Sequence, residues 1–247
     1  MIDVRSVNLS YETESEKMAV LKDISFRIQA DSTCAIIGPS GCGKSSLLFL
    51  LAGLKQPDSG EIVIAGKPRC GTILQNYGLF PWKTVAQNIG LGLALRATDR
   101  KSIKERTDSL IEEMGLAGFD NYFPSQLSGG MQQRVALARA LAIEPEILLM
   151  DEPLSSLDAL TRERLQNLFL HIRAKKKITA VIVTHSIEEA VFLGNRIVVL
   201  SKRPAGILQV VENPQAGDLA YRKREQFYTR CTMLRELLRE EFDGQET

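Results

Sequence analysis

The sequence predicts an α/β fold with a mainly parallel central sheet, an antiparallel β subdomain at the N-terminus and a helical subdomain in the middle of the chain. Largely apolar runs at residues 147–150 and 178–183 end in polar side chains, as expected of strands covered on both faces. Another apolar run, 33–37, leads through a glycine-rich loop into a further apolar segment. Segments 2–10 and 24–30 alternate apolar and polar residues, which is typical of half-buried strands.

Length and composition fit one large domain. The chain has 247 residues, 44% of them hydrophobic and 25% charged, with a net charge of +1. This near-neutral balance gives no strong attraction to nucleic acid or anionic lipid. The four cysteines are scattered, which favours free thiols in a reducing cytosol. We predict no signal peptide, and no membrane span either, since the longest apolar runs fall short of about 18 residues.

The glycine-rich loop is the strongest chemical signal in the chain. It comprises Gly38, Pro39, Ser40, Gly41, Cys42, Gly43, Lys44 and Ser45, and Ser46 follows it. Glycines let backbone N–H groups approach a polyphosphate, and the following helix adds the positive end of its dipole. In such a loop the lysine reaches the β- and γ-phosphates, and the serine hydroxyl binds Mg²⁺. We therefore predict a phosphate-loop nucleotide-binding core.

The first 75 residues read as strands and turns. Tyr11 ends the first strand, a polar loop covers 12–17, and two short strands at 60–64 and 71–75 flank a turn at 66–68. On residue type alone, Tyr11 is a packing residue as readily as a ligand contact.

Helices dominate the next part of the chain. Segments 84–96 and 100–114 are predicted helices, preceded by an aromatic stretch, 76–85, that contains the only tryptophan. Residue type leaves open whether this stretch is a buried elbow or an exposed docking surface. At 127–133, Ser128 is a good N-cap for a third helix, whose start offers a second possible phosphate site.

The later strands carry the polar strand ends. Asp151 and Glu152 close one buried strand and His185 closes the next, at the edge where open α/β sheets bind ligands. Because neighbouring residues of a strand point to opposite sides, Asp151 can serve Mg²⁺ while Glu152 faces an attacking water. We also predict a helix at 160–175, two closing strands at 196–200 and 207–211, and a tail helix from about Asp218. Its apolar stripe is predicted to pack on the domain: Phe227, Cys231, Leu234 and Leu238.

Taken together, the motifs resemble the ATP-binding cassette (ABC) family in order and spacing, over nearly the whole chain. They are residues 38–45, Gln75, 127–134, 147–153, 155–158 and His185. The resemblance implies a single ABC ATPase domain over 1–247. Its core, with the β subdomain, would be 1–75 and 145–215. The helical subdomain would be 76–144 and the C-terminal helical tail 216–247.

The resemblance also implies ATP and Mg²⁺ as ligands, with a role for each matching position. Tyr11 would stack on adenine, and residues 38–46 would hold the phosphates. The metal would be bound by Ser45, Gln75 and Asp151. Catalysis would rest on Lys44, Gln75, Glu152 and His185. A second copy, bound head to tail, would have its ATP capped by Ser128, Gly129, Gly130 and Gln132, with Asp158 at the dimer interface.

Within that family, residues 80–89, 156–162, 184–196 and 203–206 resemble the nitrate, sulfonate and taurine importer group. This likeness implies transmembrane permease subunits as partners and, indirectly, an extracytoplasmic solute-binding protein. It places the chain in the cytoplasm, peripheral on the inner face of the membrane, with no nucleic-acid partner. Ser186 and Asn195 depart from the aspartates common in the group, and neither is a catalytic position.

Two other functions remain open at this point. A soluble cassette ATPase acting on nucleic acid or ribosomes usually has two cassettes or a long coiled-coil insert. Here one cassette is present, with roughly 80 residues between Lys44 and Ser128. A phosphate-loop kinase would have no use for the 127–133 motif or for His185. We therefore predict that the chain is the ATPase subunit of an importer.

Overall fold

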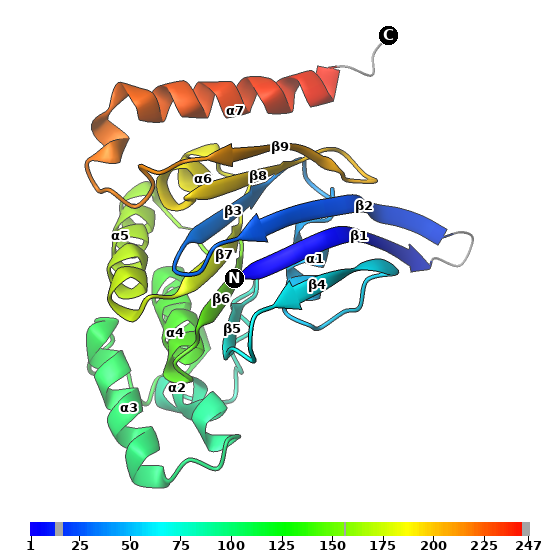
Figure 1. Ribbon diagram of the computed structural model, residues 1–247. Coiled ribbons are helices and arrows are strands. Elements are labelled where there is room, and N and C mark those ends of the chain that lie inside the picture. The colour runs from blue at the N-terminus through cyan, green and yellow to red at the C-terminus, as the bar shows by residue number, and fades with distance from the viewer. Residues whose placement is uncertain (13–16, 156, 244–247) are drawn as a thin grey trace.

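The computed structural model describes residues 1–12, 17–155 and 157–243, and it contains two sheets with helices around them (Figure 1). The inner part of the predicted polar loop at 12–17, and Ser156 of the predicted turn at 155–158, lie outside the described residues. The predicted α/β class is confirmed, including a mainly parallel central sheet and an antiparallel sheet built from the N-terminal strands.

The central sheet has six strands in the order β5-β6-β7-β3-β8-β9, and only β9 runs antiparallel to its neighbour. Its strands are β3 (Thr33–Ile37), β5 (Cys70–Ile73), β6 (Ile147–Asp151), β7 (Thr179–Val183), β8 (Arg196–Leu200) and β9 (Ile207–Glu212). Every residue of β3, β6 and β7 is buried, as the continuous apolar runs predict.

The second sheet is antiparallel, with β1 (Ile2–Glu12) between β2 (Lys17–Ile28) and β4 (Ser59–Ile64). The predicted strand at 24–30 is confirmed over 24–28, but the strand begins earlier, at Lys17, and ends at Ile28. Residues 18–23 do not alternate, and Asp23 has a φ of 49°. Pairing with β1 nevertheless carries the strand through them, with register shifts along the way. Cross-strand hydrogen bonds outweigh the local pattern here.

Seven α-helices surround the sheets in the described part of the chain (Figure 1). They are α1 (Lys44–Leu51), α2 (Val85–Ala94), α3 (Arg100–Glu113), α4 (Gly129–Ala142), α5 (Ala159–Lys176), α6 (Ile187–Leu193) and α7 (Glu225–Asp243). Short 3-10 turns occupy Pro124–Gln126 and Tyr221–Lys223. The tail helix therefore starts at Glu225 and not near Asp218, because Arg224 before it has an extended backbone.

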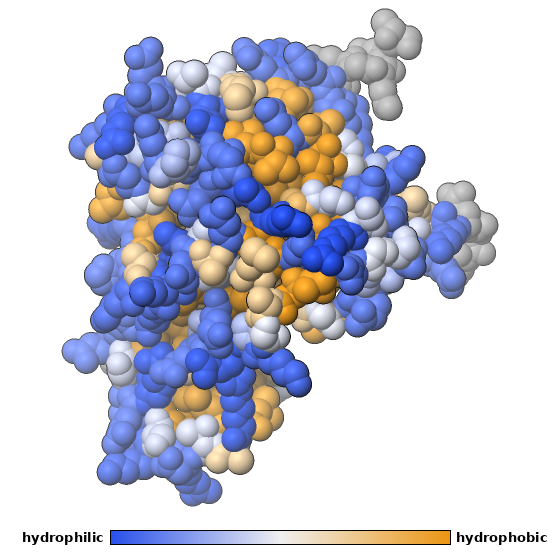
Figure 2. Space-filling view, viewed as in Figure 1, coloured by the Kyte–Doolittle hydropathy of each residue, from blue (hydrophilic) through white to orange (hydrophobic). Residues whose placement is uncertain are grey.

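Two apolar cores lie on opposite faces of the central sheet. Alternate residues of β3 divide between them: Ala35 and Ile37 face the core beneath α4 to α7, whereas Cys34 and Ile36 face α1 and the antiparallel sheet. The predicted stripe of α7 is confirmed, since Phe227, Cys231 and Leu234 are buried in the first core and Leu238 packs against it. On the face in Figure 2, apolar residues gather over the central strands and polar residues cover most of the helices.

Candidate nucleotide-binding site

The phosphate loop connects β3 to α1 and borders a pocket of about 370 Å³. Gly41 and Gly43 have φ values of 72° and 114°, which L side chains rarely adopt. The ammonium group of Lys44 donates hydrogen bonds to the carbonyls of Gly38 at 2.9 Å and Pro39 at 2.7 Å. The cation is thus held inside the curve of the loop, and α1 begins at this residue.

Most of the predicted ATP contacts line this pocket. They are Tyr11, Ser40, Gly41, Gly43, Lys44, Ser45 and Ser46, and the predicted catalytic residues Gln75 and Glu152 line it as well. Gly38, Pro39 and Cys42 are not among the lining residues. A Cβ on Gly38 would lie 2.9 Å from the Leu200 carbonyl oxygen, and Cys42 is buried beneath the loop. Burial raises the pKa of the Cys42 thiol, so it is poorly suited to reaction as a thiolate.

Three further residues line the pocket that sequence reasoning missed: Met18, Val20 and Arg203. The turn that carries Arg203 is held against β2 by main-chain hydrogen bonds of Ala205, with Lys22 at 2.9 Å and with Val20 at 2.8 Å. This pairing joins segments about 180 residues apart. No local pattern signals it, although the Pro204 turn itself was visible in the sequence.

Tyr11 is tethered at the rim of the pocket. Its hydroxyl lies 3.1 Å from the Ser46 hydroxyl, within hydrogen-bond distance. The ammonium group of Lys55 lies 4.0 Å from the centre of the ring, a cation–π contact. These contacts fix where an aromatic ring is presented to a ligand, and stacking on adenine stays a prediction.

Asp151 ends β6 beside the phosphate loop and is buried. Burial raises the pKa of this carboxyl, and the Ser45 hydroxyl opposes the rise. Its Oδ1 is buried without a hydrogen-bond partner among the described residues. No cluster of three or more His, Cys, Asp or Glu suited to a metal occurs within residues 1–12, 17–155 and 157–243. A hard cation that also binds phosphate oxygens fits this oxygen pair of Ser45 and Asp151.

Glu152 contacts two of the other predicted catalytic side chains, Gln75 and His185. Its Oε2 lies 3.2 Å from Nδ1 of His185 and accepts a hydrogen bond of 3.4 Å from Nε2 of Gln75. The three side chains come from the ends of β6 and β7 and from the segment after β5. Glu152 also has a φ of 46°, an unusual backbone conformation for a residue with a side chain.

The signature residues lie apart from this pocket. Ser128 caps α4 as predicted, since its hydroxyl accepts a hydrogen bond of 3.4 Å from the Met131 N–H. The Gln132 amide donates to the carbonyls of Pro124 and Leu127. None of Ser128, Gly129, Gly130 and Gln132 lines the nucleotide pocket of the same chain. Asp158 does not line it either, and its carboxylate caps α5 by accepting from the Thr161 N–H at 3.0 Å.

The aromatic loop before α2 is exposed at its tip. Trp82 is 70% exposed, and its ring meets that of Phe80 edge-on with 5.5 Å between ring centres. The buried Asn88 side chain holds the loop to α2. It accepts from the Phe80 N–H at 2.9 Å and donates to the Lys83 carbonyl at 2.9 Å. A groove of about 650 Å³ lies beside it between α2 and α3. Of the two alternatives for this stretch, exposure is correct for Trp82.

Within the described ranges, no helix combines the length and the apolar character needed to cross a membrane.

Comparisons with known proteins identify the family. Residues 21–155 match the ABC transporter family model. The chain is 43% identical over 218 residues to an aliphatic sulfonates import ATP-binding protein of Bacillus cereus, covering 86% of each chain. It is 46% identical over 204 residues to the Bacillus subtilis protein of that name, covering 80% of this chain and 79% of the relative. A taurine import ATP-binding protein of Pelagibacter ubique is 40% identical over 220 residues, covering 86% and 83%.

A solved structure of an ATP-binding cassette is also similar to this chain in fold. It is a dimeric ATP-binding cassette in a post-hydrolysis state, bound to ADP and Pi, with a TM-score of 0.78 and 30% identity over 86% of this chain and 98% of that one. The chain therefore belongs to the ABC transporter family, as one of its ATPase chains.

Proposed function

We propose that this chain is the ATP-hydrolysing subunit of an importer for a small anion such as an aliphatic sulfonate, taurine or nitrate. Relatives at 40–46% identity carry the names of sulfonate and taurine import proteins. The observation that carries the proposal is the meeting of Gln75, Glu152 and His185 beside a phosphate loop.

The proposed helical subdomain is 76–144, between core segments 1–75 and 145–215, with a tail at 216–247.

In the proposed mechanism the loop N–H groups and Lys44 bind the phosphates of ATP. Ser45 and Asp151, together with Gln75, would hold Mg²⁺, which neutralises phosphate charge when bound. Glu152 orients or deprotonates the attacking water. His185 contacts the γ-phosphate and keeps the Glu152 carboxylate in place. Water activation by a placed carboxylate contributes about 10²–10⁴-fold to a rate.

A second copy completes the site in this proposal. The start of α4 presents Ser128, Gly129 and Gly130 at a helix N-terminus, which binds anions through free N–H groups. These residues do not reach the pocket of their own chain. A head-to-tail dimer would bring them to the partner's γ-phosphate, with Asp158 near the interface. ATP would then favour the closed dimer, and hydrolysis would open it.

The exposed Trp82 loop and the groove between α2 and α3 form the proposed docking surface for a transmembrane permease. A loop held by Asn88 on one side and open on the other can transmit the dimer's closure as movement. The chain would then lie at the cytoplasmic face of the membrane, and a solute-binding protein would act through the permease. A net charge of +1 gives no support to the alternative, an ATPase acting on nucleic acid or ribosomes.

The experiment uses the Glu152→Gln variant, tagged and produced in the native host with ATP added. We expect ATP binding to persist, phosphate release to fall about 10²–10⁴-fold, and a multi-span membrane protein to co-purify. The wild-type chain with ADP is the control for trapping. Co-purification of ribosomes or nucleic acid without a membrane protein would overturn the importer function. Near-normal phosphate release would overturn the role of Glu152.

A further inference from the structure

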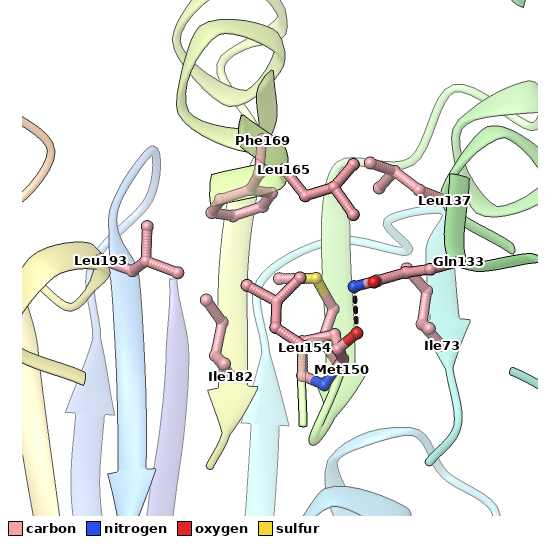
Figure 3. Close-up of a pocket in the computed structure, with 10 residues that line it drawn as sticks. Ile73, Gln133, Leu137, Met150, Leu154, Leu165, Phe169, Ile182 and Leu193 are labelled. Carbon is pink, nitrogen blue, oxygen red and sulfur yellow. Dashed lines mark hydrogen bonds between the residues drawn. The ribbon is translucent and has the colours of Figure 1, made fainter. Parts of the chain in front are cut away.

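The side chain of Gln133 joins α4 to the turn that follows Glu152. Gln133 is 4% exposed, and its Nε2 donates a hydrogen bond to the main-chain carbonyl of Pro153. Figure 3 shows the side chain reaching from its helix into a pocket, with the dashed line marking this bond. Pro153 immediately follows Glu152. One hydrogen bond thus connects α4 to the peptide beside the proposed catalytic carboxylate.

The surroundings of Gln133 are otherwise apolar. Ile73, Leu137, Met150 and Phe169 line the same pocket (Figure 3), whose free volume is about 20 Å³. The Gln133 Oε1 is buried and has no hydrogen-bond partner in the part of the chain that the structure describes. Burying a half-satisfied amide in such a place is unfavourable, and an apolar side chain would fill it better. Packing therefore does not explain why an amide stands here, whereas its bond to Pro153 does.

The Glu152 backbone conformation needs support. A φ of 46° is strained for a residue with a side chain. The Glu152 N–H donates to the Val183 carbonyl at 2.8 Å, and the Ser155 hydroxyl donates to the Glu152 carbonyl at 3.1 Å. Gln133 holds the next carbonyl along the chain. Backbone direction at this residue decides whether its carboxylate reaches Gln75 and His185, so each of these bonds bears on the site.

We propose that Gln133 is a positioning residue, which fixes the turn after Glu152 and ties the orientation of that carboxylate to the position of α4. The inference rests on the proposed function, in which Glu152 acts on the attacking water. The helix that carries Gln133, α4, begins at Gly129, about one turn earlier, and Ser128 is its N-cap. A displacement of α4 on contact with a second copy would be transmitted through this bond to the chain's own hydrolytic site.

The test compares two variants of the full chain. Gln133→Met keeps the side-chain length and removes the hydrogen bond. Leu137→Ala disturbs the same pocket from the next turn of α4 and leaves the bond in place. We expect Gln133→Met to lower kcat for ATP hydrolysis about tenfold, equivalent to about 1.4 kcal/mol. KM for ATP should change less than twofold, since Gln133 does not line the nucleotide pocket. Leu137→Ala should keep kcat within about twofold.

A third variant adds a measurement of pH dependence. In Gln133→Glu, burial should raise the pKa of the new carboxyl, and only its protonated form can donate to the Pro153 carbonyl. The kcat ratio of this variant to the wild type should therefore rise as pH is lowered from 8 to 6. The same ratio for Gln133→Met should stay flat, because methionine does not titrate.

The inference is overturned if Gln133→Met keeps kcat within twofold of the wild type, or if Leu137→Ala loses as much at a temperature where both variants are folded by circular dichroism. The results for Gln133 and for Glu152 distinguish a wrong inference about Gln133 from a wrong proposed function. An inactive Glu152→Gln beside a fully active Gln133→Met rejects only the role of Gln133. A Glu152→Gln variant with near-normal turnover rejects the role of Glu152 itself.

Discussion

Replacing Gly43 by alanine tests the packing of the phosphate loop, and the same replacement at Gly41 is the control. Replacing Gly43 by alanine puts a Cβ 2.7 Å from Cγ1 of Val20 and 3.0 Å from Cδ2 of Leu21, at a φ of 114°. Replacing Gly41 by alanine also meets a positive φ, 72°, but no atom lies within 4 Å of the new Cβ. Both variants thus place alanine at a positive φ, which lies further outside the left-handed region in Gly43→Ala, and only Gly43→Ala adds a clash.

The magnitudes follow from these two terms. Backbone strain of this kind costs about 1–3 kcal/mol per residue. Overpacking in a well-packed region adds about 1–3 kcal/mol, and only Gly43→Ala incurs it. The effect of alanine on the unfolded chain is common to both variants and cancels in the comparison. Gly43→Ala should therefore be less stable than Gly41→Ala by about 2 kcal/mol, which corresponds to about 4–8 °C in Tm for a chain of this length.

Thermal unfolding followed by circular dichroism, without nucleotide, measures the difference. Urea unfolding of the same two variants checks it at a single temperature. Equal midpoints for Gly41→Ala and Gly43→Ala would refute the reasoning, because they would mean that β2 does not press on the loop at Gly43.

Three further predictions concern other parts of the molecule. Burial alone would raise the pKa of Asp3, but hydrogen bonds from Arg27 and Arg5 lower it. The Asp3 carboxylate therefore stabilises the folded chain above about pH 4, and this stabilisation is lost as pH falls through the lowered pKa. Urea midpoints of Asp3→Asn and the wild type should accordingly differ at pH 7 and converge toward pH 3. Leu234→Ala on α7 should lower the free energy of unfolding by about 2–5 kcal/mol, since this side chain is fully buried, and an unchanged urea midpoint would mean that α7 is not packed on the domain. Trp82→Ala should leave ATP binding and Tm unchanged but abolish permease co-purification, and a retained complex would count against the docking surface.

Local signals in the sequence were enough for much of the fold. The apolar run before the phosphate loop, the continuous runs that became β6 and β7, and the cap at Ser128 all follow from neighbouring residues. Hydrophobic pattern and capping act within a few residues, so a single sequence reveals them. The start of β2 at Lys17 was missed because pairing with β1, rather than its own pattern, decides it.

Other features depended on contacts between distant segments. The short strands β4 and β5 are neighbours in the sequence but belong to different sheets. Arg203 reaches the pocket only because its turn pairs with β2. The order of strands in a sheet is set by how all the apolar faces are buried together, which no local window contains.

In the candidate site too, some features follow from the sequence and others from tertiary contacts. The sequence by itself determined the chemistry: a phosphate loop, two carboxylates after a buried strand, a histidine after the next and a capped glycine-rich helix start. Only the tertiary structure decided which groups meet. It placed His185 and Gln75 on one oxygen of Glu152, left the start of α4 away from the pocket of its own chain, and joined Gln133 to the turn after Glu152. Residue types and spacing fix what a side chain can do, whereas side-chain distances between separate strands and helices arise only when their apolar faces pack together.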